Sequence, residues 1–350
     1  MTTAQPGFNT LQEIQSQPSV WEKSLQHLKS KDRGTFPTFS DYDQVVFTGC
    51  GSTYYLSLWA ARTCEAATGV TCRAVPASEL LLHPQAWLHP GGKSLLVAVS
   101  RSAETTETLL ALKAFLAGRQ GEAIVVTCYP EHALAQLTPW VVEVPEAQEQ
   151  SVAQTRSFTS MMLAVAWLIS GVIRPELPAQ VSRAGQELLS AYTPLARQLG
   201  TDQKLSRFFF LGSGALYGLA CEAMLKMKEM SLVNSESFHV LEFRHGPMSL
   251  VDQDSLVIGL IDETSRDYES AVIKEMSLKG ARSLGILDQN DPLTANEFDS
   301  QVLIPRTLPG QWRAPLYLPI LQLIAYERAI RKGLDPDHPT NLTSVVVLHA

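Results

Sequence analysis

Residues 99–107, VSRSAETTE, gather four hydroxyl side chains and one arginine between two apolar segments, SLLVAV and LLALKAFLAG. A strand, a polar loop and a helix in this order place hydroxyls and free backbone N–H groups at a helix N-terminus, where anions bind. Ser102 is expected to be the N-cap of a helix that begins near Ala103, and Arg101 adds a charged, planar donor. A phosphate monoester suits this chemistry. The alternative is an ordinary capped helix, for which one serine is enough.

A second chemically dense segment covers residues 221–252. On a helix, Glu222, Lys226 and Glu229 fall at i, i+4 and i+7 and share one face. The pattern alone favours a solvated salt-bridge face over a methionine-lined core. Further along, FRHGP places His245 before a Gly-Pro turn, where an imidazole is available for acid–base chemistry. A carboxylate and a histidine near a phosphorylated sugar would suit a proton-transferring isomerase.

The elements that would hold these residues occur twice in the chain. VVFTGCGSTYY (45–55) and FFFLGSGALYG (208–218) are apolar runs that enter a GxG turn, and they start 163 residues apart. SELLLH from Ser78 pairs with SESFHV from Ser235, SLLVAVS with SLVIGLI, and IVVTCYP with SLGILDQ. Strand, turn, helix, strand and helix in each copy predict βαβ units. The expected fold class is α/β, with two tandem doubly wound parallel-sheet domains.

The duplication sets the expected domain boundaries. An N-terminal helical arm is expected over residues 1–40, with about two helical turns on either side of Pro18. The first domain is expected over 41–178 and the second over 179–340. Residues 161–173, MMLAVAWLISGVI, are too few to span a bilayer and are predicted to be a buried helix.

Only the first copy is expected to bind an anion. Ligands of open parallel sheets lie beyond the carboxyl ends of the strands. There the second copy has LIDETSR, in which Asp262 and Glu263 would repel an anion. The turns GCGS and GSGA lack the full GxGxxG spacing, and no acidic residue follows a second strand in the place that a ribose requires. Dinucleotide binding is therefore not favoured.

Composition excludes several classes of function. The 350 residues are 45% hydrophobic and 18% charged, as in a folded two-domain protein. The net charge of −7 gives no electrostatic reason to bind nucleic acid or a membrane. The first twenty residues lack a secretory pattern, so a cytoplasmic location is expected. Five cysteines without a CxxC pair or zinc-type histidine spacing predict reduced thiols and no metal site.

Five blocks of the sequence resemble one known family: GCGSTYY, SRSAET, KMKEMS, SESFHVLEFRHGP and KGLDPDHPTNL. In this order they resemble the pair of sugar isomerase (SIS) domains in glutamine-dependent glucosamine-6-phosphate synthase (glutamine-fructose-6-phosphate aminotransferase) and in its stand-alone aminosugar-phosphate deaminase and deglycase relatives. The resemblance covers nearly the whole chain. It implies two flavodoxin-like SIS domains and a C-terminal tail, residues 341–350, over the active site.

The resemblance also implies roles for individual residues. The family's phosphate loop reads SxSGxT, and here Arg101 and Ala103 replace its glutamine and its glycine. The general base that moves a proton between C1 and C2 corresponds to Glu229, with Lys226 beside it. The ring-opening histidine, which a neighbouring subunit supplies in the family, corresponds to His245. The implied substrate-binding residues are Ser52, Thr53, Ser100, Arg101, Ser102, Thr105, Val152 and Gln154.

Two departures from the family limit the implied activity. The chain starts MTTAQ, without the synthase's N-terminal cysteine and glutaminase domain, so no glutaminase activity is expected. The synthase places a Schiff-base lysine shortly after its NL dipeptide. In NLTSVVVLHA, Thr343 and Ser344 stand there instead, and the last lysine of the chain is Lys332.

The expected function is therefore isomerisation of an aminosugar 6-phosphate with release of ammonia, as in a deaminase or deglycase. The alternatives are a plain aldose–ketose phosphate isomerase or an ammonia-dependent, aminotransferase-like enzyme. A third possibility, from another class, is a non-catalytic phosphosugar-binding regulator, but no basic helix-turn-helix extension is present. The expected partners are a sugar 6-phosphate and a second copy of the chain, with His245 shared across a homodimer. No cofactor, metal, nucleic acid or membrane is expected.

Overall fold

The computed structural model of the chain describes residues 5–88, 91–119, 121–289, 297–346 and 348. These fall into two compact units. The N-unit comprises residues 19–149, 156–182 and 343–350, and the C-unit comprises residues 1–18, 150–155 and 183–342. Residues 1–4 of the expected N-terminal arm and residues 347, 349 and 350 of the expected tail lie outside the described residues.

The N-unit contains a five-stranded sheet in the order β2-β1-β3-β4-β5, and all of its strand pairs are parallel. Every residue of β1 and β3 is buried, as expected for central strands that are covered on both faces. The strands are β1 (Gln44–Gly49), β2 (Cys72–Pro76), β3 (Ser94–Val99), β4 (Gly121–Thr127) and β5 (Val141–Glu143).

Helices cover both faces of this sheet. On one face, Leu112 and Phe115 of α5 pack with Val46 and Leu96 of the strands. On the other, α2 and α6 pack against each other. The helices are α2 (Ser52–Thr68), α3 (Ala77–Leu82), α4 (Pro84–Trp87), α5 (Thr106–Ala117) and α6 (Arg156–Ser170), with short 3-10 turns η1 (Arg33–Thr35), η2 (Phe39–Asp41), η3 (Ala135–Leu137) and η4 (Pro145–Ala147).

The C-unit repeats this topology, with strand order β7-β6-β8-β9-β10 and parallel pairing throughout. The expected pair of parallel, doubly wound sheets is thus confirmed. The strands are β6 (Arg207–Gly212), β7 (Ser235–Phe238), β8 (Ser255–Leu260), β9 (Arg282–Asp288) and β10 (Ser300–Ile304).

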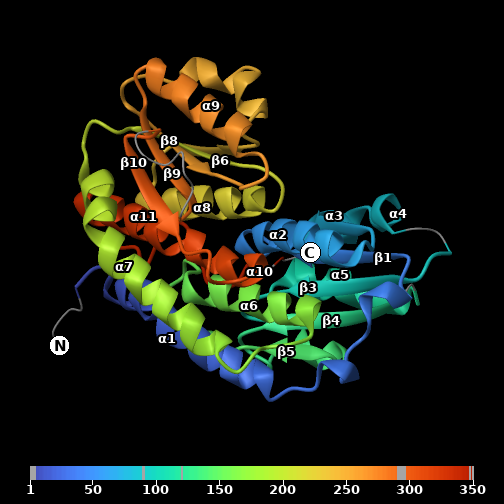
Figure 1. Cartoon of the computed structure of the whole chain (residues 1–350). Coiled ribbons are helices and arrows are strands. Elements are labelled where there is room, and N and C mark those ends of the chain that lie inside the picture. The colour runs from blue at the N-terminus through green and yellow to red at the C-terminus, as the bar shows by residue number, and fades with distance from the viewer. Residues whose placement is uncertain (1–4, 89–90, 120, 290–296, 347, 349–350) are drawn as a thin grey trace. The chain divides into compact units, whose positions relative to one another are not determined.

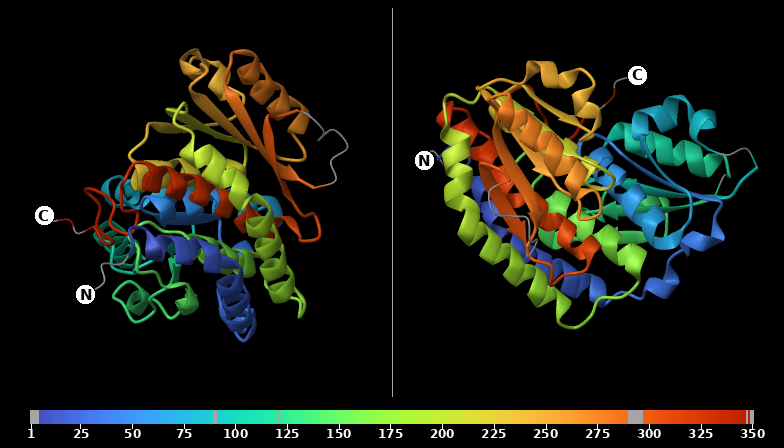
Figure 2. Two further views of the ribbon diagram at one scale, coloured as in Figure 1. Left: turned by 90° about the vertical axis from the view of Figure 1, so that its left-hand side faces the viewer. Right: turned by 45° about the horizontal axis from the view of Figure 1, so that its top comes forward.

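In the C-unit, α9 packs on β8 and β9, while α8 packs on β6 and β7 and is contacted by α11. Figures 1 and 2 show α9 on the face of the sheet that α8 and α11 leave open. The helical elements are α8 (Leu216–Ser231), η5 (Glu242–Arg244), η6 (Pro247–Leu250), α9 (Arg266–Leu278), α10 (Gly310–Arg313), η7 (Ala314–Tyr317) and α11 (Pro319–Arg331).

Two long helices, α1 (Phe8–Lys29) and α7 (Leu177–Thr201), each contribute residues to both units. In place of short helical turns around Pro18, α1 is one helix of 22 residues with Pro18 inside it. Proline cannot donate the backbone hydrogen bond to the carbonyl four residues earlier, which is that of Ile14. Gln17 Nε2 donates to this carbonyl at 3.0 Å and so compensates for the loss.

The structure corrects one pair of landmarks in the duplication. Ser235 begins β7, whose counterpart is β2, and β2 begins at Cys72, 163 residues earlier. Ser78 lies in α3 instead, so the pairing of SELLLH with SESFHV is wrong. The two segments share a Ser-Glu pair, but one lies in a helix and the other begins a strand. The buried helix predicted over 161–173 is confirmed as α6, but it begins earlier, at Arg156, and ends at Ser170, so that Val172 is exposed. Among the described residues, no helix combines the length and the apolar character needed to cross a membrane.

Candidate functional site

The hydroxyl-rich loop, residues 100–105, connects β3 to α5 in the N-unit. Ser100 Oγ accepts a hydrogen bond from the backbone N–H of Ala103 at 3.2 Å, and Ser102 Oγ accepts one from Glu104 at 3.2 Å. Each hydroxyl that accepts such a bond still has a proton to donate. The loop is therefore a compact turn that keeps donor capacity for a bound anion.

The expected start of the helix near Ala103 is wrong by three residues. Ala103 has a φ of +53°, in the left-handed region, and α5 begins at Thr106 with Thr105 as its N-cap. A left-handed residue cannot form part of a right-handed helix, so Ser102 belongs to the turn and is not the N-cap. No side-chain capping bond is made by Thr105.

Ser52 and Thr53 begin α2 directly after the GxG turn. Thr53 Oγ1 accepts from the backbone N–H of Cys50 at 2.9 Å and donates to its carbonyl at 3.0 Å, so this hydroxyl closes the turn. A Cβ on Gly49 would lie 2.5 Å from Thr53 Oγ1, which explains the glycine. Because β1 and β3 are adjacent, this turn and the hydroxyl-rich loop follow neighbouring carboxyl ends of the sheet.

Arg101 is buried within the N-unit. Its Nη1 lies 3.3 Å from Oε2 of Glu149, and the two side chains are 8% and 0% exposed. Its Nη2 donates to the carbonyl of Ser344 at 3.4 Å. Glu149 also accepts from the backbone N–H of Ser157 at 3.1 Å and from its hydroxyl. The charge of Arg101 is thus compensated by a carboxylate of the same chain.

In the C-unit, α8 carries a charged group that is buried rather than solvated. The Lys226 ammonium lies 3.3 Å from Glu222 Oε1 and donates a hydrogen bond to Glu229 Oε2. The side chains of Lys226 and Glu222 are 0% exposed, whereas that of Glu229 is 19% exposed. The solvated salt-bridge face favoured by the sequence pattern is therefore wrong. Glu229 is the one carboxylate of the three charged residues that solvent reaches.

The charge state of Lys226 follows from its neighbours. Burial alone would lower the pKa of Lys226, but the charges of Glu222 and Glu229 outweigh burial and raise it above its ordinary value. Lys226 therefore stays protonated at neutral pH. Glu222 is not among the residues implied by the family resemblance, although its helical spacing places it on this face. Its carboxylate, together with that of Glu229, compensates the charge of a fully buried ammonium.

Val152 and Gln154 lie in a short segment of the C-unit, residues 150–155. Hydrogen bonds to the side chain of Glu13 and to the backbone of Asp337 fix this segment in place. Glu13 accepts hydrogen bonds from the backbone of Gln150 at 2.6 Å and from the hydroxyl of Ser151. The backbone N–H of Val152 donates to the carbonyl of Asp337 at 3.4 Å. Gln154 Oε1 is buried and has no hydrogen-bond partner among the described residues, so it is an acceptor available to a ligand.

His245 follows η5 and is exposed. Its backbone N–H donates to the carbonyl of Glu242 at 2.9 Å, and Gly246 after it has a φ of +123°. Within the described part of the chain, no hydrogen bond joins the imidazole of His245 to Glu229. The structure thus brings Lys226 and Glu229 together but leaves His245 apart from them at the surface.

The counterpart of the hydroxyl-rich loop in the C-unit, between β8 and α9, is filled by the chain itself. Glu269 Oε2 accepts from the backbone N–H of Asp262 at 2.7 Å, and Oε1 accepts from the Ser265 hydroxyl at 2.9 Å. Burial raises the pKa of Glu269, against the hydrogen bonds from Asp262, Ser213 and Ser265. Glu269 thus takes up the donors that an anion would use, in addition to the repulsion expected from Asp262 and Glu263.

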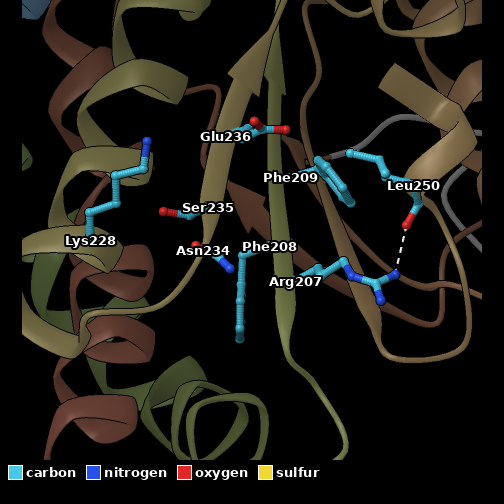
Figure 3. Close-up of a pocket in the computed structure, with 8 residues that line it drawn as sticks. All are labelled: Arg207, Phe208, Phe209, Lys228, Asn234, Ser235, Glu236 and Leu250. Atoms are coloured by element: carbon cyan, nitrogen blue, oxygen red, sulfur yellow. Dashed lines mark hydrogen bonds between the residues drawn. The ribbon is translucent and has the colours of Figure 1, made fainter. Parts of the chain in front are cut away.

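A pocket of about 300 Å³ lies in the C-unit at the amino ends of β6 and β7, away from the carboxyl edge that carries the candidate residues. Figure 3 shows Lys228 on one side of these strands and Phe209 with Leu250 on the other, so the polar groups do not converge. No group of three metal-ligating side chains is found among the described residues. The lining residues are Arg207, Phe208, Phe209, Lys228, Asn234, Ser235, Glu236 and Leu250.

Two tandem doubly wound domains with a hydroxyl-rich loop define a known class of protein. The SIS domain family matches residues 38–171 and 202–330, and the chain belongs to this family. The resemblance expected from the sequence is thereby confirmed.

Particular relatives share this architecture. The chain is 25% identical over 342 residues to the glutamine-fructose-6-phosphate aminotransferase (isomerizing) of Methanothermobacter thermautotrophicus, covering 97% of this chain and 57% of that protein. This chain thus spans little more than half of that relative. Among solved structures, it is similar to glucosamine-6-phosphate deaminase from Thermotoga maritima, with a TM-score of 0.80, 26% identity and coverage of 97% and 100%. Tagatose-6-phosphate ketose/aldose isomerase from Escherichia coli, with a TM-score of 0.85, 24% identity and 99% coverage of both chains, shares the fold.

Proposed function

We propose that this protein is a phosphosugar isomerase that acts on an aminosugar 6-phosphate and releases ammonia. The observation that carries the proposal is the pair on α8: a partly exposed carboxylate, Glu229, beside a fully buried lysine, Lys226, that stays charged. A carboxylate that solvent reaches can accept a proton from carbon, and a fixed ammonium beside it holds it in place. The hydroxyl-rich loop supplies donors for the phosphate of the substrate.

The proposed reaction conserves every atom of a 2-amino-2-deoxyaldose 6-phosphate and one water. His245 transfers the proton that opens the sugar ring. Glu229 then removes the C2 proton and returns a proton to C1, while the C1 carbonyl oxygen takes up a proton in exchange for the one that the C2 amine gives up. The product is an imine at C2, and water hydrolyses it to a ketose phosphate and ammonia. None of these steps requires a metal or a redox cofactor, since ring opening, enolisation and imine hydrolysis are all acid–base chemistry.

Binding of the substrate is proposed to use both sets of candidate residues. Ser52, Thr53 and the hydroxyls of Ser100, Ser102 and Thr105 would bind the phosphate. Val152 and Gln154 would face the sugar, and the buried, unpartnered Oε1 of Gln154 supports an acceptor role toward a sugar hydroxyl or amine. The similarity to glucosamine-6-phosphate deaminase from Thermotoga maritima, whose whole chain is matched, supports the aminosugar in preference to a neutral sugar.

The test is a substrate panel of glucosamine 6-phosphate, galactosamine 6-phosphate, fructosamine 6-phosphates and fructose 6-phosphate. Ammonia and ketose phosphate are measured together for each compound. Ammonia release in equal amount to the ketose supports the proposal. Ketose–aldose conversion without ammonia would instead establish a plain isomerase, and ammonia uptake by fructose 6-phosphate would establish the reverse, synthetic reaction. Tight binding without turnover of any member would indicate a phosphosugar-binding regulator.

We also propose that the protein acts as a homodimer in which His245 serves the site of the other subunit. Its exposed imidazole, without a hydrogen-bond partner in the described chain, supports this arrangement. Glu229→Gln and His245→Asn are each expected to be inactive. Mixed dimers of the two would contain one site free of both substitutions, so unfolding and refolding them together should restore about a quarter of the parent's activity. No recovery in verified mixed dimers would refute the shared site.

A further inference from the structure

Arg101 lies in the hydroxyl-rich loop, but its guanidinium is turned into the N-unit. Its side chain is 8% exposed and pairs with Glu149, which is fully buried. Its own carbonyl accepts from the backbone N–H of Cys128 at 3.2 Å and from the hydroxyl of Thr127 at 3.0 Å, which fixes the backbone at this point. Glu149 in turn accepts from the backbone N–H of Ser157 at the start of α6. Arg101 is therefore held between the end of β4 and, through Glu149, the start of α6.

Another contact of Arg101 is with the C-terminal segment, of which the structure describes residues 343–346 and 348. Nη2 donates to the carbonyl of Ser344 at 3.4 Å. Next to it, the carbonyl of Val346 accepts from the backbone N–H of Thr106 at 3.5 Å, and the N–H of Leu348 donates to Thr106 Oγ1 at 3.3 Å. All three contacts use the backbone of the segment. These hydrogen bonds thus depend on Arg101 and Thr106 and not on the identity of the segment's side chains.

We infer that Arg101 is a positioning residue: its ion pair with Glu149 fixes the guanidinium where it holds the C-terminal segment, through Ser344, against the hydroxyl-rich loop and the start of α5. This deepens the proposed function, on which it rests for the role of the loop in phosphate binding. A guanidinium is suited to the task because its planar fork donates to Glu149 and to Ser344 from different nitrogens at the same time. Glu149 compensates the charge of Arg101, so we assign Arg101 the task of organising the loop and not of binding the substrate.

Hydrogen–deuterium exchange of the full, ligand-free chain tests this inference without any activity assay. In Arg101→Gln, exchange over residues 343–348 is expected to rise about tenfold, while β3 and α5 keep the protection of the parent. Arg101→Lys should restore part of the protection, because one ammonium cannot make both contacts. Two controls should match the parent: Lys113→Gln, which removes an exposed positive charge from α5, and Ser344→Ala, which retains the backbone carbonyl.

A second variant and a binding measurement keep the test decisive. Glu149→Gln retains an acceptor for Ser157 but removes the charge that orients Arg101, so it should raise exchange over the same segment even if Arg101→Gln loses protection in β3. Titration with inorganic phosphate then tests whether Arg101 contacts the anion directly. Unchanged exchange over 343–348 in both variants would overturn the inference. If phosphate binding were lost as well in Arg101→Gln, Arg101 would be a ligand contact instead of a positioning residue. Failure of the isomerase proposal would leave the exchange result intact.

Discussion

At the scale of residues, the hydroxyls of the N-unit are predicted to determine phosphate affinity. Ser102 Oγ accepts from the backbone N–H of Glu104 and still has a proton to donate. Ser102→Ala should weaken binding of a sugar 6-phosphate by about tenfold or more, because a hydrogen bond to a charged group contributes about 1.5–3 kcal/mol. Isothermal titration calorimetry measures the change. Ser30→Ala, an exposed hydroxyl at the end of α1, should bind like the parent, and equal affinity in both variants would contradict the assignment.

The residue scale also shows what sequence alone can and cannot predict about the site. The clustering of Ser100, Ser102 and Thr105 after an apolar run was enough to predict a loop at a strand end. The left-handed φ of Ala103 was not predictable, because alanine is an ordinary helix former. Likewise, helical spacing shows that Glu222 and Lys226 share a face of α8. It does not show whether other elements cover that face, and here both side chains are fully buried.

At the scale of elements, Lys332 is predicted to hold the C-terminal end of α8. Its ammonium donates to the carbonyls of Ser231 at 2.7 Å and Leu232 at 3.2 Å, two and three residues after Glu229. Lys332→Gln should lower the free energy of unfolding by about 1 kcal/mol, since a cation at a helix C-terminus contributes about this much. Chemical denaturation measures it, with Lys332→Arg expected to restore stability. Lys113→Gln, exposed in the middle of α5 and away from any helix end, is the control, and an equal loss in it would argue against capping.

The short edge strand β5 is predicted to be held by a pH-dependent contact. Glu143 at its end pairs with Lys31, two residues beyond α1, and at 3.2 Å with His27 in the last turn of α1. Burial favours a higher pKa for Glu143, but Lys31 and His27 outweigh burial and lower it. A depressed carboxyl pKa stabilises the fold above the unfolded value of about 4.3 and loses this effect as pH falls through the folded value.

Glu143→Gln removes that titration. The parent should therefore lose more stability than Glu143→Gln when denaturation is compared at pH 7 and at pH 3.5, and the difference between the two proteins should shrink in acid. Glu187→Gln, an exposed residue of α7, should follow the parent. A difference that stays constant across this range would show that Glu143 does not titrate as the ion pairs require.

At the scale of the whole molecule, the duplicated topology is predicted to bind one anion per chain. Apolar runs and GxG turns at nearly constant separation were sufficient to predict two parallel doubly wound sheets, because buried strands and tight turns depend on local residue types. In the C-unit, the loop between β8 and α9 has its donors taken up by Glu269, which lies four residues beyond this loop. The local sequence pattern did not reveal this role of Glu269. Titration with glucosamine 6-phosphate should give one bound ligand per chain, and two would contradict the conclusion that Glu269 occupies the second loop.

The measurement that tests the central claim most directly is incorporation of solvent deuterium into the sugar. Glucosamine 6-phosphate is incubated with enzyme in D₂O, and deuterium at C1 of the ketose product and at C2 of the remaining substrate is followed by NMR. The parent is predicted to incorporate deuterium at C1 as ammonia is released. Glu229→Gln is predicted to bind the substrate with similar affinity and to incorporate none. Incorporation by Glu229→Gln at the parent's rate would show that Glu229 is not the base.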